Sequence, residues 1–516
     1  MNNRYYITTP IYYVNDAPHI GHAYTTLACD VIARFMRLDG REVMFLTGTD
    51  EHGQKVEKAA ANAGVAPQAF TDKVSQNFRS LAQRMKYSHD DFIRTTEPRH
   101  IKASQALWKA IEASGNIYLG AYEGWYSVRD EAFFAEEELV PGPGGKKRAP
   151  TGADVEWVKE PSYFFKLSAW QEPLLRYYEQ NPLAIQPDSR RNEIVSFISG
   201  GLRDLSISRT SFKWGIPVPG APEHIMYVWL DALANYLTAI GYPDTDSPTF
   251  KRFWPADVHV VGKDIVRFHA VYWPAFLMAA GLEPPRRVFA HGWWTVEGEK
   301  MSKSLGNAID PNVLVDRFGL DALRYFLLRE VPFGNDGDFS QAAMIQRINS
   351  DLANDLGNLC QRSLSMIQSY FAGVLPKPEH LSDRDKTLLE QASMLHQTVA
   401  ASVSRQALND ALQEIWRVVS DANRYVDSEK PWTVRKTDAV RAGTVLYVLA
   451  ETVRQIALLL QAFIPDSAGR ILDQLVVPAD QRTFAARSSQ LVSGVTLPKP
   501  EGIFPRYVTE ETGAAK

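Results

Sequence analysis

Hydrophobic and polar positions change their spacing along the chain, and this change divides the sequence into two regions. Before about residue 340, short apolar runs alternate with stretches of helical spacing, which is typical of βαβ units. Residues 7–14 predict a strand, residues 21–38 a helix ended by Asp39-Gly40, and residues 43–46 a buried strand. After about residue 341 apolar positions recur every three or four residues, which predicts amphipathic helices packed as a bundle.

The strand pattern is interrupted in its middle. Parallel-sheet strands are predicted again at residues 258–261 and 288–290, but from Asn116 to Pro222 aromatic and charged residues alternate. We interpret that stretch as an inserted domain, so the sequence predicts an α/β fold: a Rossmann-type parallel sheet split by an insertion and followed by a C-terminal helical bundle. The predicted segments are residues 1–115 for the first half of the Rossmann-type sheet domain, 116–222 for the insertion, 223–290 for the second half of the sheet domain, 291–340 for a connective segment and 341–516 for the helical domain.

Composition narrows the class of protein. The chain has 516 residues, 45% hydrophobic and 22% charged, which is enough for several domains and argues against disorder. No run of eighteen apolar residues predicts a membrane span, and the first residues lack a secretory signal. The two cysteines, Cys29 and Cys360, exclude a disulfide framework and a four-cysteine zinc site, and they fit a reducing cytoplasm. Because the net charge is −4, any RNA contact must depend on the local placement of Arg, Lys and aromatic residues.

The first chemical motif is His19-Ile20-Gly21-His22, where a predicted strand gives way to a helix. Helix N-termini present free N–H groups and bind phosphate well, and Gly21 lets a flat base or ribose approach the backbone. Two histidines one turn apart can donate hydrogen bonds to phosphate oxygens as negative charge develops. The alternative is that both histidines only cap the helix.

The second motif is Lys300-Met301-Ser302-Lys303-Ser304, preceded by Gly298. Two lysines three residues apart make a loop able to fold over a triphosphate, because lysine is a compact point charge. Alone, such a loop is usually a solvated surface turn. Its combination with the earlier histidine motif favours the phosphate-binding interpretation.

Both motifs, in this order, resemble those of the class I aminoacyl-tRNA synthetases. Residues 9–15, 47–53, 227–232 and 262–269 are similar to patterns of the methionyl-tRNA synthetases within that class. The resemblance implies a class I catalytic domain that activates L-methionine with ATP and transfers it to the 3′ terminal ribose of tRNA(Met). It implies catalytic roles for His19, His22, Lys300 and Lys303, and ATP binding by His19, Gly21, His22, Lys300, Ser302 and Lys303. Magnesium is expected to travel with ATP, held mainly by phosphate oxygens.

The resemblance also implies a methionine site. Asp50, at the carboxyl end of a buried strand, is expected to hold the ammonium group of methionine, although an aspartate there can also simply form a turn. The side-chain pocket is expected to consist of Ile11, Tyr13, Trp229, Ala232, Leu233, Tyr236, Ile265, His269 and Trp273. Aromatic walls suit a thioether, but ordinary core packing is the alternative for each aromatic residue.

In the helical domain, Asn358, Arg362 and Trp432 match the family's anticodon-reading positions. Asn358 and Arg362 share a helical face, and Trp432 follows Pro431 at a helix break, where an indole can stack on an unpaired base. The alternatives are a buried helix cap for Asn358 and a core filler for Trp432.

The chain departs from the family in its insertion. Many members carry a zinc knuckle of paired cysteines there, whereas the stretch around residues 124–128 has no cysteine, so we expect no structural zinc and no other protein-bound metal. The basic turn at residues 146–148 can touch the tRNA acceptor stem or be a solvated loop tip. Without an appended dimerisation module we expect a monomer in the cytoplasm, with no membrane partner.

Three rival functions remain open at this point. Another class I specificity, for leucine, isoleucine or cysteine, would need a large editing insertion or metal-binding cysteines, which the sequence lacks. A small nucleotidyltransferase uses a similar histidine motif but leaves residues 341–516 without a role. A tRNA-binding protein without catalysis is disfavoured because Asp50 and the lysine motif are intact.

Overall fold

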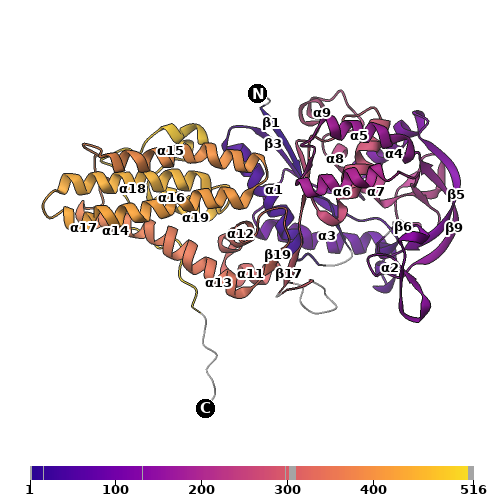
Figure 1. Cartoon of the computed structure of the whole chain (residues 1–516), viewed down its shortest axis with the longest axis horizontal. Coiled ribbons are helices and arrows are strands. Elements are labelled where there is room, and N and C mark those ends of the chain that lie inside the picture. Colours follow the sequence, from indigo (N-terminus) through magenta and orange to yellow (C-terminus); the bar gives the residue numbers. More distant parts are fainter. Residues whose placement is uncertain (1–2, 15–16, 131, 297, 301–308, 509–516) are drawn as a thin grey trace, which may run out of the picture. The chain divides into compact units, whose positions relative to one another are not determined.

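The structure, a computed structural model, describes residues 3–14, 17–130, 132–296, 298–300 and 309–508. The chain divides into two compact units, which we name by their content. The sheet unit comprises residues 4–18 and 44–291, and the helical unit comprises residues 1–3, 19–43 and 292–516. Figure 1 labels their elements along the chain.

The main sheet of the sheet unit has seven strands within the described residues, in the order β10-β16-β15-β1-β3-β2, with β4 also paired to β3. The pairs β1–β15, β15–β16, β10–β16, β2–β3 and β3–β4 are parallel. The strands are β1 (Arg4–Thr8), β2 (Tyr12–Tyr13), β3 (Glu42–Asp50), β4 (Asp91–Arg94), β10 (Ile185–Gln186), β15 (Val258–Gly262) and β16 (Val288–His291). This arrangement confirms the predicted parallel α/β sheet.

The strand predicted over residues 7–14 is instead two strands, β1 and β2. Pro10 lies between them, and proline has a fixed φ and no N–H to donate to a neighbouring strand. After this break, Tyr12 pairs with Thr49 near the end of β3. The proline therefore brings Ile11 and Tyr13 to the carboxyl end of the sheet, where α/β proteins bind their ligands.

Helices accompany these strands in the sheet unit. They are α2 (Gln54–Asn62), α3 (Pro67–Arg84), α4 (Pro98–Ala113), α5 (Gln171–Gln180), α6 (Asp188–Ser199), α7 (Val228–Leu233), α8 (Asn235–Thr238), α9 (Pro248–Phe253), α10 (Trp273–Ala279) and the π-helix Phe268–Tyr272. A continuous apolar core joins helices α4 to α10 to the sheet, with Trp108, Tyr236, Trp273 and Phe276 among its fully buried members, whereas α2 and α3 contribute Val56 and Phe78 to a separate small cluster.

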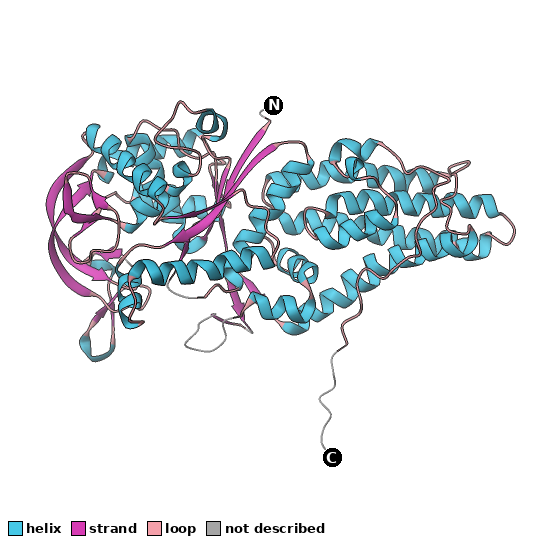
Figure 2. Ribbon diagram, turned by 180° about the vertical axis from the view of Figure 1, so that it is seen from behind, coloured by secondary structure: helices cyan, strands magenta, loops and turns pink. Residues whose placement is uncertain are grey.

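The stretch predicted as an insertion contains a separate antiparallel sheet in the order β11-β9-β5-β6. Its strands are β5 (Ile117–Ser127), β6 (Ala132–Phe134), β9 (Glu156–Phe165) and β11 (Leu205–Ser206), and Figure 2 shows the long curved β5–β9 pair. Shorter strands are β7 (Val140–Pro141), β8 (Lys147–Arg148), β12 (Ser208–Arg209), β13 (Pro217–Val218) and β14 (Ala221–Met226). Within the same stretch β10 pairs with β16 of the main sheet, so the boundaries 116 and 222 stay a prediction.

The helical unit contains α1 and, after three short strands, a bundle. The elements are α1 (Ile20–Leu38), β17 (Trp294–Val296), β18 (Glu299–Lys300), α11 (Pro311–Phe318), α12 (Leu320–Arg329), β19 (Gly337–Phe339), α13 (Gln341–Arg347), the π-helix Ile348–Gly357, α14 (Asn358–Tyr370), α15 (Asp383–Ser404), α16 (Leu408–Glu429), α17 (Pro431–Val434), α18 (Ala439–Leu460) and α19 (Pro465–Gln474). Among the described residues the named strands end at Phe339, which confirms the predicted helical C-terminal domain.

Helix α18 is the core of the bundle. It contacts α14, α15, α16, α17 and α19, and from Ala442 to Leu460 all of its residues are buried. By length and composition α18 could cross a membrane. However, 94% of its most apolar stretch of 18 residues is buried inside the structure. Its apolar faces are therefore explained by helix packing.

Candidate functional site

Helix α1 begins at the histidine motif, and both histidines cap it. The His19 Nδ1 atom accepts a hydrogen bond from the Gly21 N–H at 3.1 Å, and His22 Nδ1 accepts from the His19 N–H at 3.1 Å. A neutral imidazole that accepts at Nδ1 carries its proton on Nε2, which can donate to a phosphate oxygen. Capping the helix and donating to phosphate are thus compatible roles for these rings.

Gly21 is required by the shape of this cap. A Cβ atom built on Gly21 would lie 2.9 Å from Cε1 of His19, which is closer than real Cβ contacts. Any other residue at this position would displace the His19 ring, so Gly21 fixes the ring position as well as leaving space for a ligand.

The chain that follows the lysine motif contacts the same helix end. Residues 301–308, which include Ser302 and Lys303, lie outside the described residues, but Lys300 ends β18 and pairs with Thr295 of β17. On the other side of the motif, the carbonyl of Ile309 accepts a hydrogen bond at 3.1 Å from the N–H of Ile20. The residue after the lysine loop therefore contacts the first turn of the helix that carries His19 and His22.

The base of the lysine loop has a carboxylate that sequence reasoning missed. Asp338 of β19 accepts hydrogen bonds from the Thr295 hydroxyl at 2.6 Å and from the Gly298 N–H at 2.8 Å. Trp294 of β17 packs edge-on against Tyr24 of α1, with ring centroids 5.4 Å apart. These contacts join β19, β17 and α1.

A buried ion pair anchors α1 further along its length. Arg324 of α12 donates to Asp30 at 2.7 Å, and both side chains are fully buried. The same guanidinium donates to the carbonyl of Phe463 at 2.8 Å, and Arg34 also donates to Asp30. A buried charge is costly unless it is paired, so this set of contacts fixes α1 against the end of α18.

The predicted methionine residues all lie in the sheet unit, in two groups that differ in burial. Ala232, Leu233, Tyr236, His269 and Trp273 are buried, at 5% exposure or less, whereas Ile11, Tyr13, Trp229 and Ile265 are half-buried and pack against that core. Trp229, Ala232, Leu233 and Tyr236 are spaced as on one helical face, but they are divided between α7 and α8, which meet at Ala234 with helical backbone angles. The half-buried residues are the ones that can line a pocket, and the buried ones support them.

His269 is the polar member of this aromatic cluster. Its Nδ1 donates to the Ile265 carbonyl at 2.9 Å, so its Nε2 accepts from the Tyr236 hydroxyl at 2.7 Å. Burial lowers the pKa of His269 to about 4, against the smaller opposing effects of the Ile265 hydrogen bond and Asp264. The ring is therefore neutral at physiological pH. It lies in a π-helix, a feature frequent at functional sites.

Asp50 ends β3 and is buried, at 6% exposure. The residues after it are held by buried polar contacts. The carboxylate of Glu51 accepts two hydrogen bonds from Arg94, at 2.7 and 2.9 Å, and Trp214 donates to the Glu51 carbonyl at 2.6 Å. Tyr13 donates to the carbonyl of His52 at 3.0 Å. The backbone that carries Asp50 is thus preorganised.

Asp231 connects this segment to the helix of the predicted pocket, and sequence reasoning missed it. Its carboxylate, only 1% exposed, contacts His52 Nδ1 at 2.7 Å and His100 Nε2 at 2.8 Å. Although burial alone would raise the pKa of Asp231, the two histidines lower it to about 2. A charged residue between Trp229 and Ala232 in an otherwise apolar run was the available signal.

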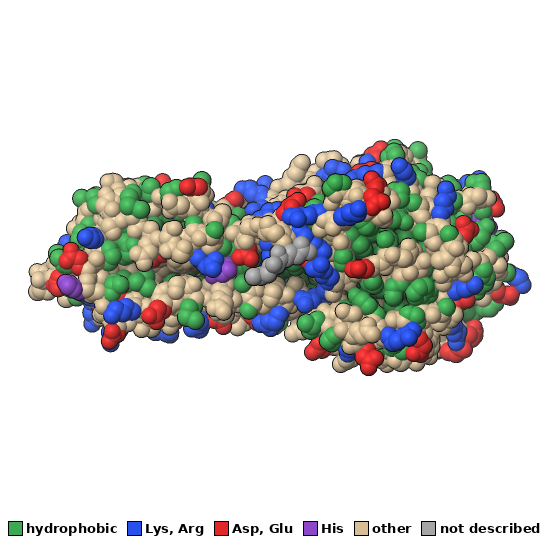
Figure 3. Space-filling view, turned by 90° about the horizontal axis from the view of Figure 1, so that it is seen from above, with side chains coloured by type: hydrophobic (Ala, Val, Ile, Leu, Met, Phe, Trp, Pro, Cys, Tyr) green, Lys and Arg blue, Asp and Glu red, His purple; other side chains and the backbone are tan. Residues whose placement is uncertain are grey.

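The three predicted anticodon residues lie in the helical unit and are accessible. Asn358 is exposed, Trp432 is 36% exposed, and neither is the buried cap or core filler of the alternative interpretation. Arg362 contacts Asp427 at 2.8 Å and Asn423 at 3.3 Å, both on α16, and sequence reasoning did not identify these partners. Figure 3 shows both basic and acidic side chains on the face that it draws.

The insertion is held by ion pairs and aromatic rings. Asp130 accepts from Ser127 at 2.9 Å and Thr151 at 2.5 Å, Arg148 pairs with Asp154 at 3.0 Å, and the rings of Trp125 and Trp157 meet edge to face. The described residues contain no group of three or more His, Cys, Asp or Glu side chains placed to hold a metal ion. Cys29 and Cys360 are both buried.

Comparisons with known proteins agree with this geometry. The family described as "tRNA synthetases class I (M)" matches residues 5–364, and the "anticodon binding domain of methionyl tRNA ligase" matches residues 375–515. The chain is 56% identical over 513 residues to a protein of Mesorhizobium japonicum named methionine–tRNA ligase, covering 99% of both chains. A protein of the same name from Brucella suis is 56% identical over 506 residues, covering 98% of each.

A solved structure is equally similar. It is described as Mycobacterium tuberculosis methionyl-tRNA synthetase in complex with methionyl-adenylate, with 54% identity and a TM-score of 0.96. The match covers 98% of this chain and 100% of that one. The similarity therefore extends over the sheet, the insertion and the helical bundle together.

Proposed function

Because the chain belongs to the class I methionyl-tRNA synthetases, we propose that the residues described above carry the two steps of methionine attachment to tRNA(Met). In the first step the methionine carboxylate attacks the α-phosphate of ATP, pyrophosphate leaves, and methionyl-adenylate forms. In the second step a hydroxyl of the terminal tRNA ribose attacks the activated carbonyl and AMP leaves. Family membership removes the rival interpretations as a small nucleotidyltransferase and as a non-catalytic tRNA-binding protein.

We assign methionine binding to the sheet unit. Asp50 holds the ammonium group by a charge-assisted hydrogen bond. The thioether lies against the half-buried residues Ile11, Tyr13, Trp229 and Ile265, and behind them Ala232, Leu233, Tyr236, His269 and Trp273 set the shape and depth of the pocket. His269 is neutral and already hydrogen-bonded to Tyr236, so this ring presents no positive charge to an apolar side chain.

We assign ATP binding and phosphate chemistry to the helical unit. His19 and His22 donate from Nε2 to phosphate oxygens, the first turn of α1 adds its N–H groups, and Gly21 admits the nucleotide. Lys300, Ser302 and Lys303 close over the triphosphate and stabilise the charge that moves onto the leaving pyrophosphate. Magnesium arrives with ATP, bound by phosphate oxygens.

The observation that best supports this assignment is the hydrogen bond from the Ile20 N–H to the Ile309 carbonyl, which joins the end of the lysine loop to the histidine motif. The test is ATP–pyrophosphate exchange with each of the twenty amino acids, on the native protein and on Lys303→Ala. We expect exchange with methionine alone, and a large loss of its rate in the variant. Unchanged exchange in Lys303→Ala would contradict the role of the lysine loop.

We assign anticodon reading to Asn358, Arg362 and Trp432. Unpaired bases are recognised by stacking and by hydrogen bonds to their exposed edges, and these accessible side chains supply both. Trp432→Ala should weaken charging of tRNA(Met) and spare methionine-dependent exchange. Equal losses in both assays would mean that Trp432 is structural.

The remaining assignments concern the molecule as a whole. We propose a cytoplasmic monomer without a structural zinc ion or a membrane partner, organised in the five segments predicted from the sequence. Metal analysis of the purified protein tests the zinc assignment, and sedimentation of the free protein tests the monomer. One equivalent of zinc, or a dimer at micromolar concentration, would overturn the respective assignment.

A further inference from the structure

Trp432 lies on a short segment between two long helices. We call residues 430–438, between the end of α16 and the start of α18, the Trp432 corner; it includes α17 and lies at one end of the bundle. Lys430 adopts a left-handed backbone (φ 45°), which reverses the chain after α16. The corner is a strained turn that the surrounding structure must hold in place.

Backbone hydrogen bonds between neighbouring residues shape the corner. The N–H groups of Thr433 and Val434 donate to the Lys430 carbonyl, at 2.8 and 3.1 Å, and further turns of the same kind continue to Asp438. Arg435 lies over the ring of Tyr370, the last residue of α14, at 4.0 Å. A helix of four residues is too short to be stable by itself, so its position depends on the helices at its two ends.

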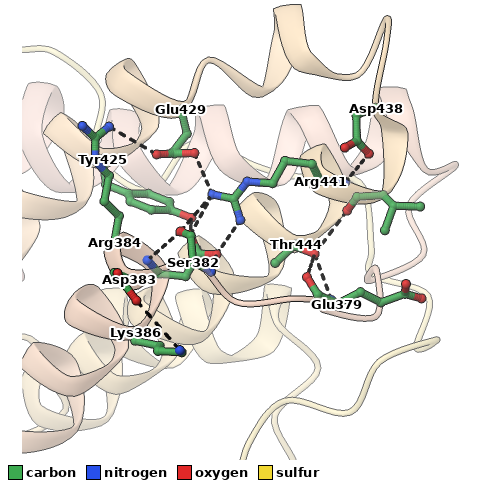
Figure 4. Close-up of polar contacts among 12 residues, drawn as sticks. Glu379, Ser382, Asp383, Arg384, Lys386, Tyr425, Glu429, Asp438, Arg441 and Thr444 are labelled. Carbon is green, nitrogen blue, oxygen red and sulfur yellow. Dashed lines mark hydrogen bonds and ion pairs between the residues drawn. The ribbon is translucent and has the colours of Figure 1, made fainter.

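Arg441 binds the elements at both ends of the corner. Its guanidinium donates to Glu429, the last residue of α16, at 2.6 Å, although Arg441 itself belongs to the first turn of α18 (Figure 4). The same guanidinium forms a two-pronged ion pair with Asp385 of α15, through Nη1 to Oδ2 and through Nη2 to Oδ1, the latter at 2.9 Å. One side chain thus joins three helices around the corner.

The acceptor of this ion pair is itself fixed. The side chain of Asp385 is fully buried and also accepts from the Tyr425 hydroxyl at 2.6 Å and from the Ser382 N–H at 2.9 Å. Burial alone would raise the pKa of Asp385, but the hydrogen bonds from Arg441 and Tyr425 hold it below its usual value. Asp385 is therefore charged and held in place. Because Arg441 binds both Asp385 and Glu429, it fixes Glu429 relative to Asp385.

We propose that Arg441 is a positioning residue for tRNA recognition: by tying Glu429 and Asp385 together, it holds the Trp432 corner in the conformation that stacks on the anticodon. This inference rests on the assignment of Trp432 to anticodon reading. The side chain of Arg441 is largely buried, at 21% exposure, so it acts through the corner and not by contact with RNA. A preorganised corner spares the complex the cost of ordering it on binding.

The experiment compares two variants in two assays. Arg441→Met removes both branches made by this guanidinium, and the longer pair between Arg384 of α15 and Glu429, at 3.5 Å, remains. Glu429→Gln weakens the branch to the corner and the pair with Arg384, while leaving Asp385 paired with Arg441. We expect each to lower kcat/KM for charging of tRNA(Met) by about fivefold or more, up to the loss caused by Trp432→Ala, since base stacking on an aromatic residue is worth about 5- to 150-fold. Methionine-dependent pyrophosphate exchange should stay within about twofold of native.

Arg454→Met is the matched control. Arg454 lies on the same helix, is buried, and pairs in two-pronged fashion with Glu451 at 2.6 and 2.9 Å, away from the corner. We expect it to lower the melting temperature about as much as Arg441→Met does, yet leave tRNA charging near native below that temperature. Equal losses of charging in the two arginine variants, or native charging in Glu429→Gln, would overturn the proposal.

The double variant Trp432→Ala/Arg441→Met separates this proposal from the one on which it rests. If Arg441 acts through Trp432, the double variant should charge tRNA no worse than Trp432→Ala alone. Fully additive losses would refute the positioning role of Arg441 and leave anticodon reading by Trp432 intact. Native charging in Trp432→Ala would instead refute the assignment of Trp432, and the inference with it.

Discussion

Replacing His269 by glutamine should change how the stability of the protein depends on pH. His269 is 1% exposed and is held by the Ile265 carbonyl and the Tyr236 hydroxyl. Burial disfavours its protonated form, so its pKa is about 4 in the folded protein, against 6.5 in an exposed histidine. As pH falls below 6.5, the unfolded chain takes up a proton that the folded protein refuses, and unfolding becomes more favourable.

The magnitude follows from these two pKa values. Between pH 7.5 and pH 5.5 the linkage predicts a loss of about 1.3 kcal/mol of folding free energy from this one group. The value is insensitive to the folded pKa as long as that pKa lies well below 5.5. His259, also buried with a lowered pKa, adds a loss of the same sign, but it is present in both the native protein and the variant.

The assay is urea unfolding, followed by tryptophan fluorescence, at pH 7.5 and 5.5 for the native protein and for His269→Gln. The substitution shifts stability at both pH values for reasons of packing, so only the difference between the two shifts is informative. We expect the native protein to lose about 1.3 kcal/mol more than the variant on acidification. Identical pH dependences would show that His269 takes up a proton as readily in the folded protein as in the unfolded chain, and the lowered pKa described above would be wrong.

Three further predictions concern residues that support the site. Asp231→Asn should raise KM for methionine about tenfold or more and leave KM for ATP unchanged, because charge-assisted hydrogen bonds to His52 and His100 are weakened. Steady-state pyrophosphate exchange measures both KM values, and equal effects on the two substrates would contradict the prediction. Gly21→Ala should slow exchange by about 10- to 100-fold at unchanged melting temperature by displacing the His19 ring; a native rate would show that the ring position is not critical. Arg324→Met should cost about 3 kcal/mol in urea unfolding because Asp30 loses a buried partner, Arg34 remaining beside it; a loss below 1 kcal/mol would mean that water replaces the guanidinium.

Much of the fold could be predicted because periodicity records which faces are buried. Apolar positions spaced by three or four residues, such as 412, 415, 419, 422 and 426 on α16 and 445, 449, 453, 456 and 460 on α18, are all buried. The helix after the histidine motif and the strands at 258–261 and 288–290 are confirmed within one residue or so. These signals are local, so the sequence alone carries them.

What the sequence could not predict depends on distant partners. The apolar spacing of residues 7–14 predicts one strand, because it does not reflect backbone hydrogen bonds. Pro10 has no N–H to donate to a neighbouring strand, and it divides the segment in two. The helices α5 and α6 lie in a stretch where the aromatic residues obscured the helical period. The roles of Asp231, Asp338 and Arg441 depend on hydrogen-bond partners that lie between 12 and 179 positions away in the sequence. A local sequence pattern does not reveal such partners. Family resemblance led to the residues proposed to bind substrate, and the structure identified the residues that contact and support them.

Helix α18 also sets a length. Its 22 residues span about 33 Å and begin at the Trp432 corner. Just beyond its other end, the carbonyl of Phe463 accepts a hydrogen bond from Arg324, which also pairs with the helix that carries His22. Because each residue of a helix turns the chain by about 100°, inserting one residue in α18 would rotate Arg441 away from Glu429. Inserting seven would nearly restore its facing and move it about 10 Å outward. The number of residues between Arg441 and Phe463 therefore fixes both the distance and the rotation between the Trp432 corner and the contact with Arg324.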